Sequence, residues 1–149
     1  CPQAKISILS NSTFIHRPKI HEALSKVDNN ILKLDTINAE YINEVDRPTQ
    51  PSYNVNQIIA NIKAFNGQAI IQTMFMKGTA ENGYNVDNTT EAFVTPWLET
   101  LKEIAPREVM IYTIDRETPD QHLQKATHEE LDAIRDRVIA LGIPCTASY

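Results

Sequence analysis

Four runs of apolar residues in this chain each end in polar residues, and a helix-like segment follows each run. The runs occupy residues 5–11, 30–35, 68–77 and 108–117. Strands that alternate with helices form a parallel sheet, and the loops after the strands collect functional residues at the carboxyl ends of the strands. The pattern therefore predicts an α/β fold of the (β/α)-barrel kind and indicates part of an enzyme.

Helical periodicity and end signals support the same alternation. The expected helices lie at 18–27, 39–45, 55–65, 89–104 and 127–142, and residues 143–148 are a candidate fifth strand. Asn88 is an expected N-cap, and Thr127 with Glu130 forms a capping-box pattern. The connections from strand to helix are mostly long, especially 77–87 and 115–126, which directs functional elaboration to one rim of the sheet.

Length and charge limit the classes of protein that the chain can belong to. A closed eight-stranded barrel needs roughly 250 residues, whereas this chain has 149, so we expect a single domain, residues 1–149, that forms an open, TIM-like partial barrel. The 14 basic and 19 acidic residues are interspersed, which argues against a dedicated surface for nucleic acid or membrane. Without a transmembrane-length apolar run or a signal-peptide layout, we expect a soluble, cytoplasmic protein.

Lys33 and Asp35 are the first candidates for a site. Residues i and i+2 of a strand point to the same face, so this pair holds opposite charges close together. The pair either binds a polar ligand or forms an ion pair in a polar barrel interior. Lys33 alone also permits Schiff-base chemistry if desolvation lowers its pKa.

Four further polar residues lie in or at the ends of the expected strands. Ser10 and Asn11 close the first strand, where they serve either as turn residues or as ligand contacts. Gln72 lies among apolar residues of the third strand and needs a hydrogen-bond partner if it is buried. Tyr112 lies near the end of the fourth strand and is a further candidate.

Metal and nucleotide motifs are lacking in the sequence. Cys1 and Cys145 lie near opposite ends of the chain, and neither has the close partners of a thiolate metal site, so we expect free thiols. The histidines do not have the spacing of paired metal ligands on a helix, and no Rossmann, P-loop or nucleophile-elbow motif occurs.

Four stretches taken together resemble one known family. They are ILSNST at 8–13, ILKLD at 31–35, IQTMFMKG at 71–78 and VMIYTIDRETP at 109–119. The chain resembles radical S-adenosylmethionine (radical SAM) proteins, in particular bacterial members described as iron–sulfur oxidoreductases. The resemblance implies a (β/α)6 partial barrel, of which this chain forms roughly strands 3 to 6. It falls on the later part of that core and includes no family-defining motif.

The resemblance implies two cofactors for the full-length protein, S-adenosylmethionine (SAM) and a [4Fe-4S] cluster that cleaves it reductively. The CxxxCxxC loop that holds the cluster is absent here, so the expected N-terminal, cluster-binding part lies outside this sequence. We expect neither cofactor bound to this fragment alone, and no metal ligands in it.

The same resemblance implies which residues face the SAM and substrate cavity. By position they are Ser10 and Asn11 after the third strand of the core, Lys33 and Asp35 on the fourth, Gln72 on the fifth and Tyr112 on the sixth. It further implies an unidentified substrate and a reduced flavodoxin or ferredoxin as the electron donor. An exposed edge on the first strand of the chain would allow a dimer.

Two other interpretations remain open at this point. The first is a Schiff-base lyase or aldolase that uses Lys33. The second is a non-catalytic module in which a doubly wound sheet binds a small ligand at the carboxyl ends of its strands.

Overall fold

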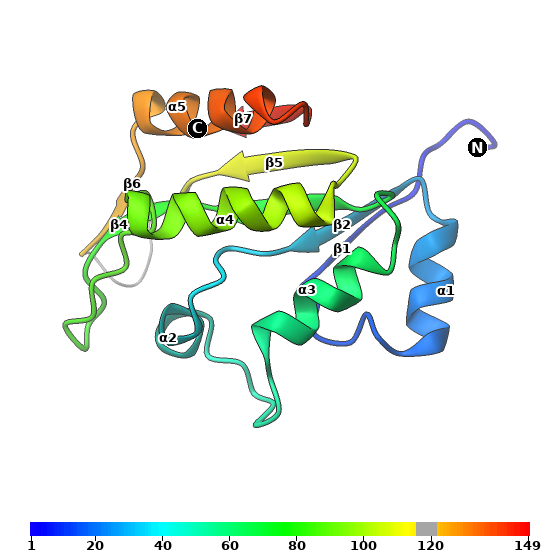
Figure 1. Cartoon of the computed structure of the whole chain (residues 1–149), viewed down its shortest axis with the longest axis horizontal. Helices are drawn as coiled ribbons and strands as arrows, with labels where there is room; N and C mark the ends of the chain where they lie inside the picture. Colours follow the sequence, from blue (N-terminus) through cyan, green and yellow to red (C-terminus); the bar gives the residue numbers. More distant parts are fainter. Residues whose placement is uncertain (116–121) are drawn as a thin grey trace.

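The computed structural model describes residues 1–115 and 122–149 and contains a five-stranded parallel sheet (Figure 1). The strands lie side by side in the order in which they occur in the sequence. They are β1 (Ser7–Ser10), β2 (Asn29–Lys33), β3 (Ile70–Met74), β5 (Glu108–Tyr112) and β7 (Cys145–Ser148). The predicted parallel α/β partial barrel is confirmed, and the candidate strand at 143–148 is its fifth member.

The strand order excludes a doubly wound sheet. A doubly wound sheet reverses its order at a switch point and carries helices on both faces. Here the order never reverses, so successive right-handed crossovers place their helices on the same face. The doubly wound sheet expected for a non-catalytic binding module is therefore wrong, whereas the binding of a small ligand stays a prediction.

Five helical segments connect the strands at nearly the predicted positions. They are α1 (Pro18–Lys26), α2 (Ala39–Tyr41) with the π-helical turn η1 (Ile42–Asp46), α3 (Val55–Lys63), α4 (Glu91–Ile104) and α5 (His128–Ala140). Local end signals explain their bounds: Pro18 occupies the first turn of α1, and the Asn54 side chain accepts hydrogen bonds from two N–H groups of α3. The predicted capping box of Thr127 and Glu130 begins α5.

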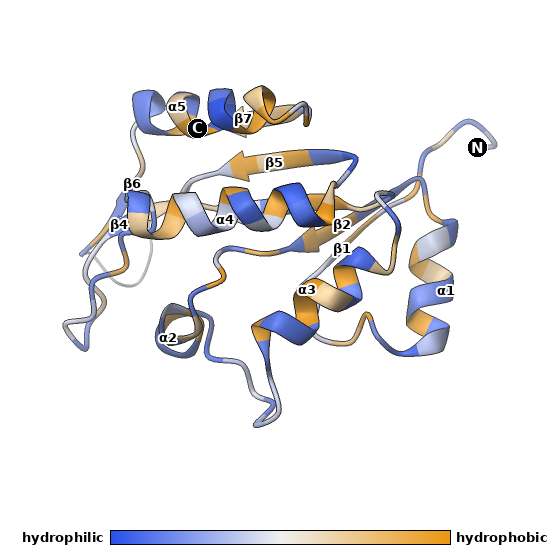
Figure 2. Ribbon diagram, viewed as in Figure 1, coloured by the Kyte–Doolittle hydropathy of each residue, from blue (hydrophilic) through white to orange (hydrophobic). Residues whose placement is uncertain are grey.

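The main core lies between the helices and one face of the sheet. Strand residues on this face are almost fully buried, as Leu32, Ile71 and Val109 show, and they pack with Leu101 and Leu131 of the helices. Figure 2 shows apolar strands beside helices whose polar and apolar residues alternate in stripes. The opposite face, which carries Lys33, Gln72 and Tyr112, is half-buried. We call it the open face.

The strand expected in the apolar run at 68–77 is interrupted at Phe75. Its N–H donates to the carbonyl of Tyr112, and a separate strand β4 (Met76–Gly78) then pairs in antiparallel fashion with β6 (Leu123–Lys125). These strands form a ribbon beyond the carboxyl ends of the sheet. The predictions of loops at 77–87 and 115–126 are therefore wrong where the ribbon lies, and residues 116–121 are outside the described part.

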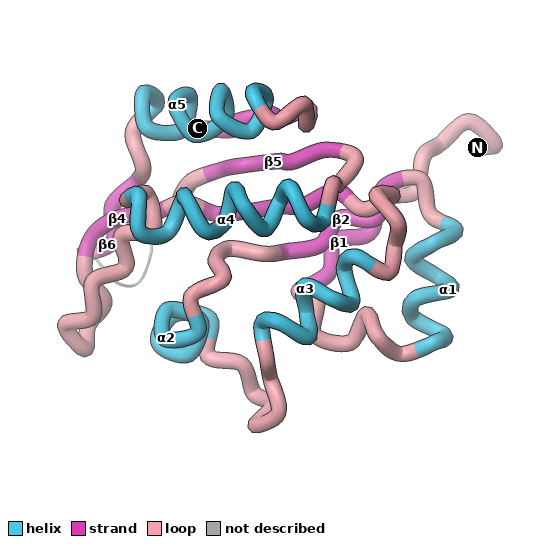
Figure 3. The backbone as a smooth tube through the Cα atoms, viewed as in Figure 1, coloured by secondary structure: helices cyan, strands magenta, loops and turns pink. Residues whose placement is uncertain are grey.

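The long connections follow the strands, as predicted. Figure 3 shows loops on both sides of α2 in the connection from β2 to α3, and the ribbon lies at the same rim. No helix among the described residues is long and apolar enough to cross a membrane.

Strand β1 forms one edge of the sheet. Ile6, just before the strand, and Leu9 within it are each 60% exposed, and Ile8 is also exposed. The first strand therefore has the exposed edge that the resemblance implied, and several side chains there are apolar.

Gly78 is required by the close approach of the two ribbon strands. Its φ is +103°, and a Cβ at this position would lie 2.1 Å from the carbonyl oxygen of His122. We expect Gly78→Ala to lower the free energy of unfolding by about 3 kcal/mol or more, because backbone strain and steric overlap add. Gly83 is the matched control: its φ is +83° with nothing near its Cβ position, so Gly83→Ala should cost only about 1–2 kcal/mol. Equal losses in urea unfolding would show that the overlap does not matter.

Candidate functional site

Lys33 and Asp35 form the centre of a cavity at the carboxyl ends of β1 and β2. The cavity has a volume of about 460 Å³, within the usual range for small-molecule sites. It is lined by Asn11, Thr13, Lys33, Leu34, Asp35, Thr36, Val45, Asp46, Arg47, Pro48, Thr49, Tyr53 and Met74. Polar side chains from the sheet thus meet the π-helical turn and the loop before α3.

A second hollow lies farther across the open face. Its volume is about 340 Å³, and it is lined by Gln72, Met110, Ile111, Tyr112, Thr113, Asp115, Ser148 and Tyr149. The strand register places Lys33 beside Gln72, and Gln72 beside Met110. The two hollows are therefore neighbours on one face of the sheet.

The structure brings five of the six predicted site residues to these hollows. Asn11, Lys33 and Asp35 line the first, while Gln72 and Tyr112 line the second. Ser10 lines neither hollow. It pairs with Leu32, which lies in the core beneath the helices, and its hydroxyl accepts a hydrogen bond from the N–H of Ser12 at 3.1 Å, so it acts as a turn residue.

Asp35 uses both carboxylate oxygens inside the protein. Oδ1 accepts the N–H of Met74 at 2.8 Å, and Oδ2 lies 3.0 Å from the ammonium of Lys33. Burial raises the pKa of Asp35, while the Lys33 charge and the Met74 N–H oppose the rise. Two acceptor oxygens are the arrangement of a carboxylate, so the pair is an ion pair. Asp35 positions Lys33, and the rest of the Lys33 ammonium faces the cavity.

The charge state of Lys33 argues against Schiff-base chemistry. Burial is the largest single effect and lowers the pKa of Lys33, but the charge and hydrogen bond of Asp35, with Tyr112 and Asp46, together outweigh it, and the pKa is raised above its usual value. A Schiff-base lysine needs a lowered pKa so that the amine is neutral. The environment of Lys33 does the opposite.

Three further groups of these hollows respond to the same charges. Burial, and then the negative charge of Asp35, raise the pKa of Asp46 to about 6, although Lys33 opposes the rise. Burial is also the main cause of the raised pKa of Tyr53 and of Tyr112. Both tyrosines therefore keep their hydroxyl protons at neutral pH and can donate hydrogen bonds.

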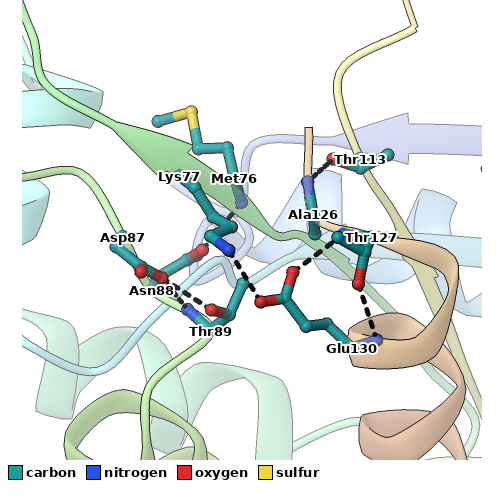
Figure 4. Close-up of polar contacts among 9 residues, drawn as sticks. All are labelled: Met76, Lys77, Asp87, Asn88, Thr89, Thr113, Ala126, Thr127 and Glu130. Carbon is teal, nitrogen blue, oxygen red and sulfur yellow. Dashed lines mark hydrogen bonds and ion pairs between the residues drawn. The ribbon is translucent and has the colours of Figure 1, made fainter. Parts of the chain in front are cut away.

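Asn88 holds the carboxyl end of β3 one step further along the strand than Asp35. Its Nδ2 donates to the carbonyl of Met74 at 2.8 Å, and its Oδ1 accepts the N–H of Met76 at 2.9 Å (Figure 4). The predicted role of Asn88 as an N-cap is wrong, because Thr90 precedes the first residue of α4. Asn88 instead satisfies backbone groups where the strand is interrupted.

An ion pair connects the ribbon to α5. Lys77 Nζ lies 2.8 Å from Glu130, and Glu130 also accepts the N–H of Thr127 in the capping box (Figure 4). Sequence reasoning missed this pair, together with Asp46, Tyr53 and the role of Asn88. The acidic end of the predicted helix at 39–45 was the only available signal for Asp46.

The arrangement suits binding of a polar small molecule. In residues 1–115 and 122–149, no three His, Cys, Asp or Glu side chains are placed to hold a metal ion. A [4Fe-4S] cluster requires closely spaced thiolates, whereas the chain contains only Cys1 and Cys145, and burial raises the pKa of Cys145 to about 12. The cysteines of this chain do not fit the cluster.

Solved structures of radical SAM enzymes share this fold. A radical SAM methyltransferase from Sphaerobacter thermophilus matches 97% of this chain with a TM-score of 0.70 and 16% identity, over 40% of its own length. A domain of pyruvate-formate lyase-activating enzyme from Bacteroides vulgatus matches 97% of the chain with a TM-score of 0.68 and 13% identity, over 82% of its length. The chain therefore has the α/β partial-barrel fold of radical SAM enzymes.

Curated relatives add similarity in sequence without a described activity. The UPF0026 proteins of Helicobacter pylori strains J99 and 26695 are 29% and 31% identical over 116 residues, which is 75% of this chain. The chain spans 34% of the length of each of these relatives. No protein-family model matches the chain.

The ion pair predicts how the reactivity of Lys33 changes when its partner is removed. In Asp35→Asn the amide keeps an acceptor for the N–H of Met74, but the negative charge is lost while burial persists, so the pKa of Lys33 should fall. We expect Lys33 to be acylated faster in the variant than in the original chain at pH 8, as measured by peptide mass spectrometry. Exposed Lys5 provides the internal reference and should react at one rate in both proteins. An unchanged acylation rate at Lys33 would show that Asp35 does not raise the pKa of Lys33.

Proposed function

We propose that this chain forms the SAM- and substrate-facing part of a radical SAM enzyme. In full-length form, the protein would cleave SAM reductively at a [4Fe-4S] cluster and start radical chemistry on a substrate that is not identified. One observation carries the proposal: in a fold shared with radical SAM enzymes, two polar hollows adjoin on the open face at the carboxyl ends of the strands. Such barrels build their active sites at that end.

The cluster itself would be held by residues outside this chain. The two cysteines do not fit a cluster, and the curated relatives are about three times as long as the matched segment. The contribution of this chain is therefore to bind and orient, and no step at the cluster is assigned to its residues.

The residues of the hollows have separate roles in the proposal. The ammonium of Lys33, fixed by Asp35, offers a positive charge to an anionic group of the ligand. Gln72 and Tyr112 lie beyond it on the open face and offer an amide and a hydroxyl. Asn11 adds an amide to the lining of the first cavity.

The proposal also includes an electron donor and a cellular location. Reductive cleavage of SAM consumes an electron, and a reduced flavodoxin or ferredoxin is the kind of protein that would supply it. Such a donor would place the full-length enzyme in the cytoplasm.

The test is the product of SAM cleavage. A longer natural protein that contains this chain, reconstituted with iron and sulfide without oxygen and then reduced, should convert SAM to 5′-deoxyadenosine, measured by liquid chromatography. Lys33→Met should raise the KM for SAM by about tenfold, because a charge-assisted contact is worth roughly 1.5–3 kcal/mol.

Lys26→Met is the matched control. Lys26 pairs with Glu22 on the exposed surface of α1, and its loss should leave the KM unchanged. Absence of 5′-deoxyadenosine from a protein with a full cluster would overturn the proposed function.

A further inference from the structure

Asparagine precedes glycine at two places in this chain, Asn66–Gly67 and Asn82–Gly83. Glycine has no side chain to obstruct its backbone nitrogen, so that nitrogen can approach and attack the side-chain amide carbon of the residue before it. Such a pair is open to spontaneous deamidation wherever the folded chain leaves both groups free. The surroundings of the two pairs therefore decide which of them reacts.

Hydrogen bonds hold the reacting groups of Asn82 and Gly83. The N–H of Gly83 donates to the carbonyl of Ala80 at 2.8 Å. The side chain of Asn82 uses both of its polar atoms: Oδ1 accepts the N–H of Tyr84 at 3.0 Å, and Nδ2 donates to Glu44 at 2.9 Å. The backbone nitrogen and the amide carbon therefore meet only after these bonds break.

The corresponding groups of Asn66 and Gly67 have no such partners. Asn66 is exposed in the turn after α3, and in the described part of the chain its side chain makes no hydrogen bond. The N–H of Gly67 donates to no acceptor among residues 1–115 and 122–149. Neighbouring bonds close the turn instead, from the N–H of Asn66 to Lys63 and from the N–H of Gln68 to Phe65. Both reacting groups are thus free while the turn is formed.

We propose that Asn66 is a site of spontaneous deamidation in the folded protein and that the hydrogen bonds of Asn82 protect it. The backbone nitrogen of Gly67 attacks the amide carbon of Asn66 and gives up its proton to solvent base. A five-membered succinimide ring forms, while the amide nitrogen takes up a proton and leaves as ammonia. Water then opens the ring at either carbonyl carbon. The product is aspartate or isoaspartate, in which the backbone runs through the side chain.

Either product changes the turn that leads into β3. Aspartate adds a negative charge just beyond the carboxyl end of α3, where the helix dipole disfavours it. Isoaspartate lengthens the backbone where space is limited, because a Cβ on Gly67 would lie 3.0 Å from the carbonyl oxygen of Ala105. Strand β3 is the central strand of the sheet and carries Gln72 to the second hollow. Deamidation thus acts at the entry to the strand that joins the two hollows.

The test compares the two sites within one protein. The folded chain is incubated at pH 8, and conversion of each asparagine to aspartate and isoaspartate is followed by peptide mass spectrometry. Asn66 should react about tenfold faster than Asn82 or more, because hydrogen bonds worth about 1 kcal/mol each must first break at Asn82. Asn66→Asp should abolish the fast phase of ammonia release and leave the slow conversion of Asn82 unchanged.

The chain unfolded in guanidinium chloride is the matched control. Both asparagines then precede glycine without any held group, so the two sites should react at similar rates. Equal rates in the folded chain, a faster reaction at Asn82, or no reaction at Asn66 would each overturn the proposal. A preference for Asn66 that persists in the unfolded chain would overturn it as well, because the preference would then come from the local sequence and not from the fold.

Discussion

The carboxylate of Asp35 joins the sheet to the cavity, and the geometry of the open face depends on it. At the point where β2 leaves β3, the N–H of Met74 would lose its partner, and Asp35 supplies one. The same carboxylate fixes the ammonium of Lys33. Asn88 performs the matching task on the carbonyl of Met74. Two side chains thus replace strand pairing along the edge of β3 that β2 leaves, so the strands can separate into a cavity without leaving buried backbone groups unsatisfied.

Most of the fold could be predicted because its signals are local. The apolar runs, the proline at the start of α1 and the capping box of Thr127 each act within a few residues, and the structure retains all of them. The side-chain alternation of a strand also sufficed to place Lys33 and Asp35 on one face. These features follow from backbone geometry, which is the same in any protein.

The errors arose where partners are distant in sequence. Asn is a residue type that often caps helices, but the side-chain amide of Asn88 bonds to Met74 and Met76. Nothing in the neighbouring sequence indicates these contacts. The ribbon strands have three residues each, too short for a periodic pattern. Ser10 was placed on the wrong face because the alternation gives the spacing of a strand and not which face is buried. Asp46 became a site residue only when the π-helical turn brought it beside Lys33.

Because β1 lies at an exposed edge, the strands of the sheet differ in how easily they open to solvent. Strand β3 has neighbours on both sides, and its amides can exchange with solvent only when a large part of the structure opens. Within residues 1–115 and 122–149, strand β1 is bonded to β2 on one side only, and its apolar side chains already meet water. Fraying should therefore begin at β1 and proceed inward toward β2, which carries Lys33. The position of Lys33 in the cavity thus depends on the least protected strand of the sheet. Any contact that stabilises the β1 edge will also stabilise the cavity.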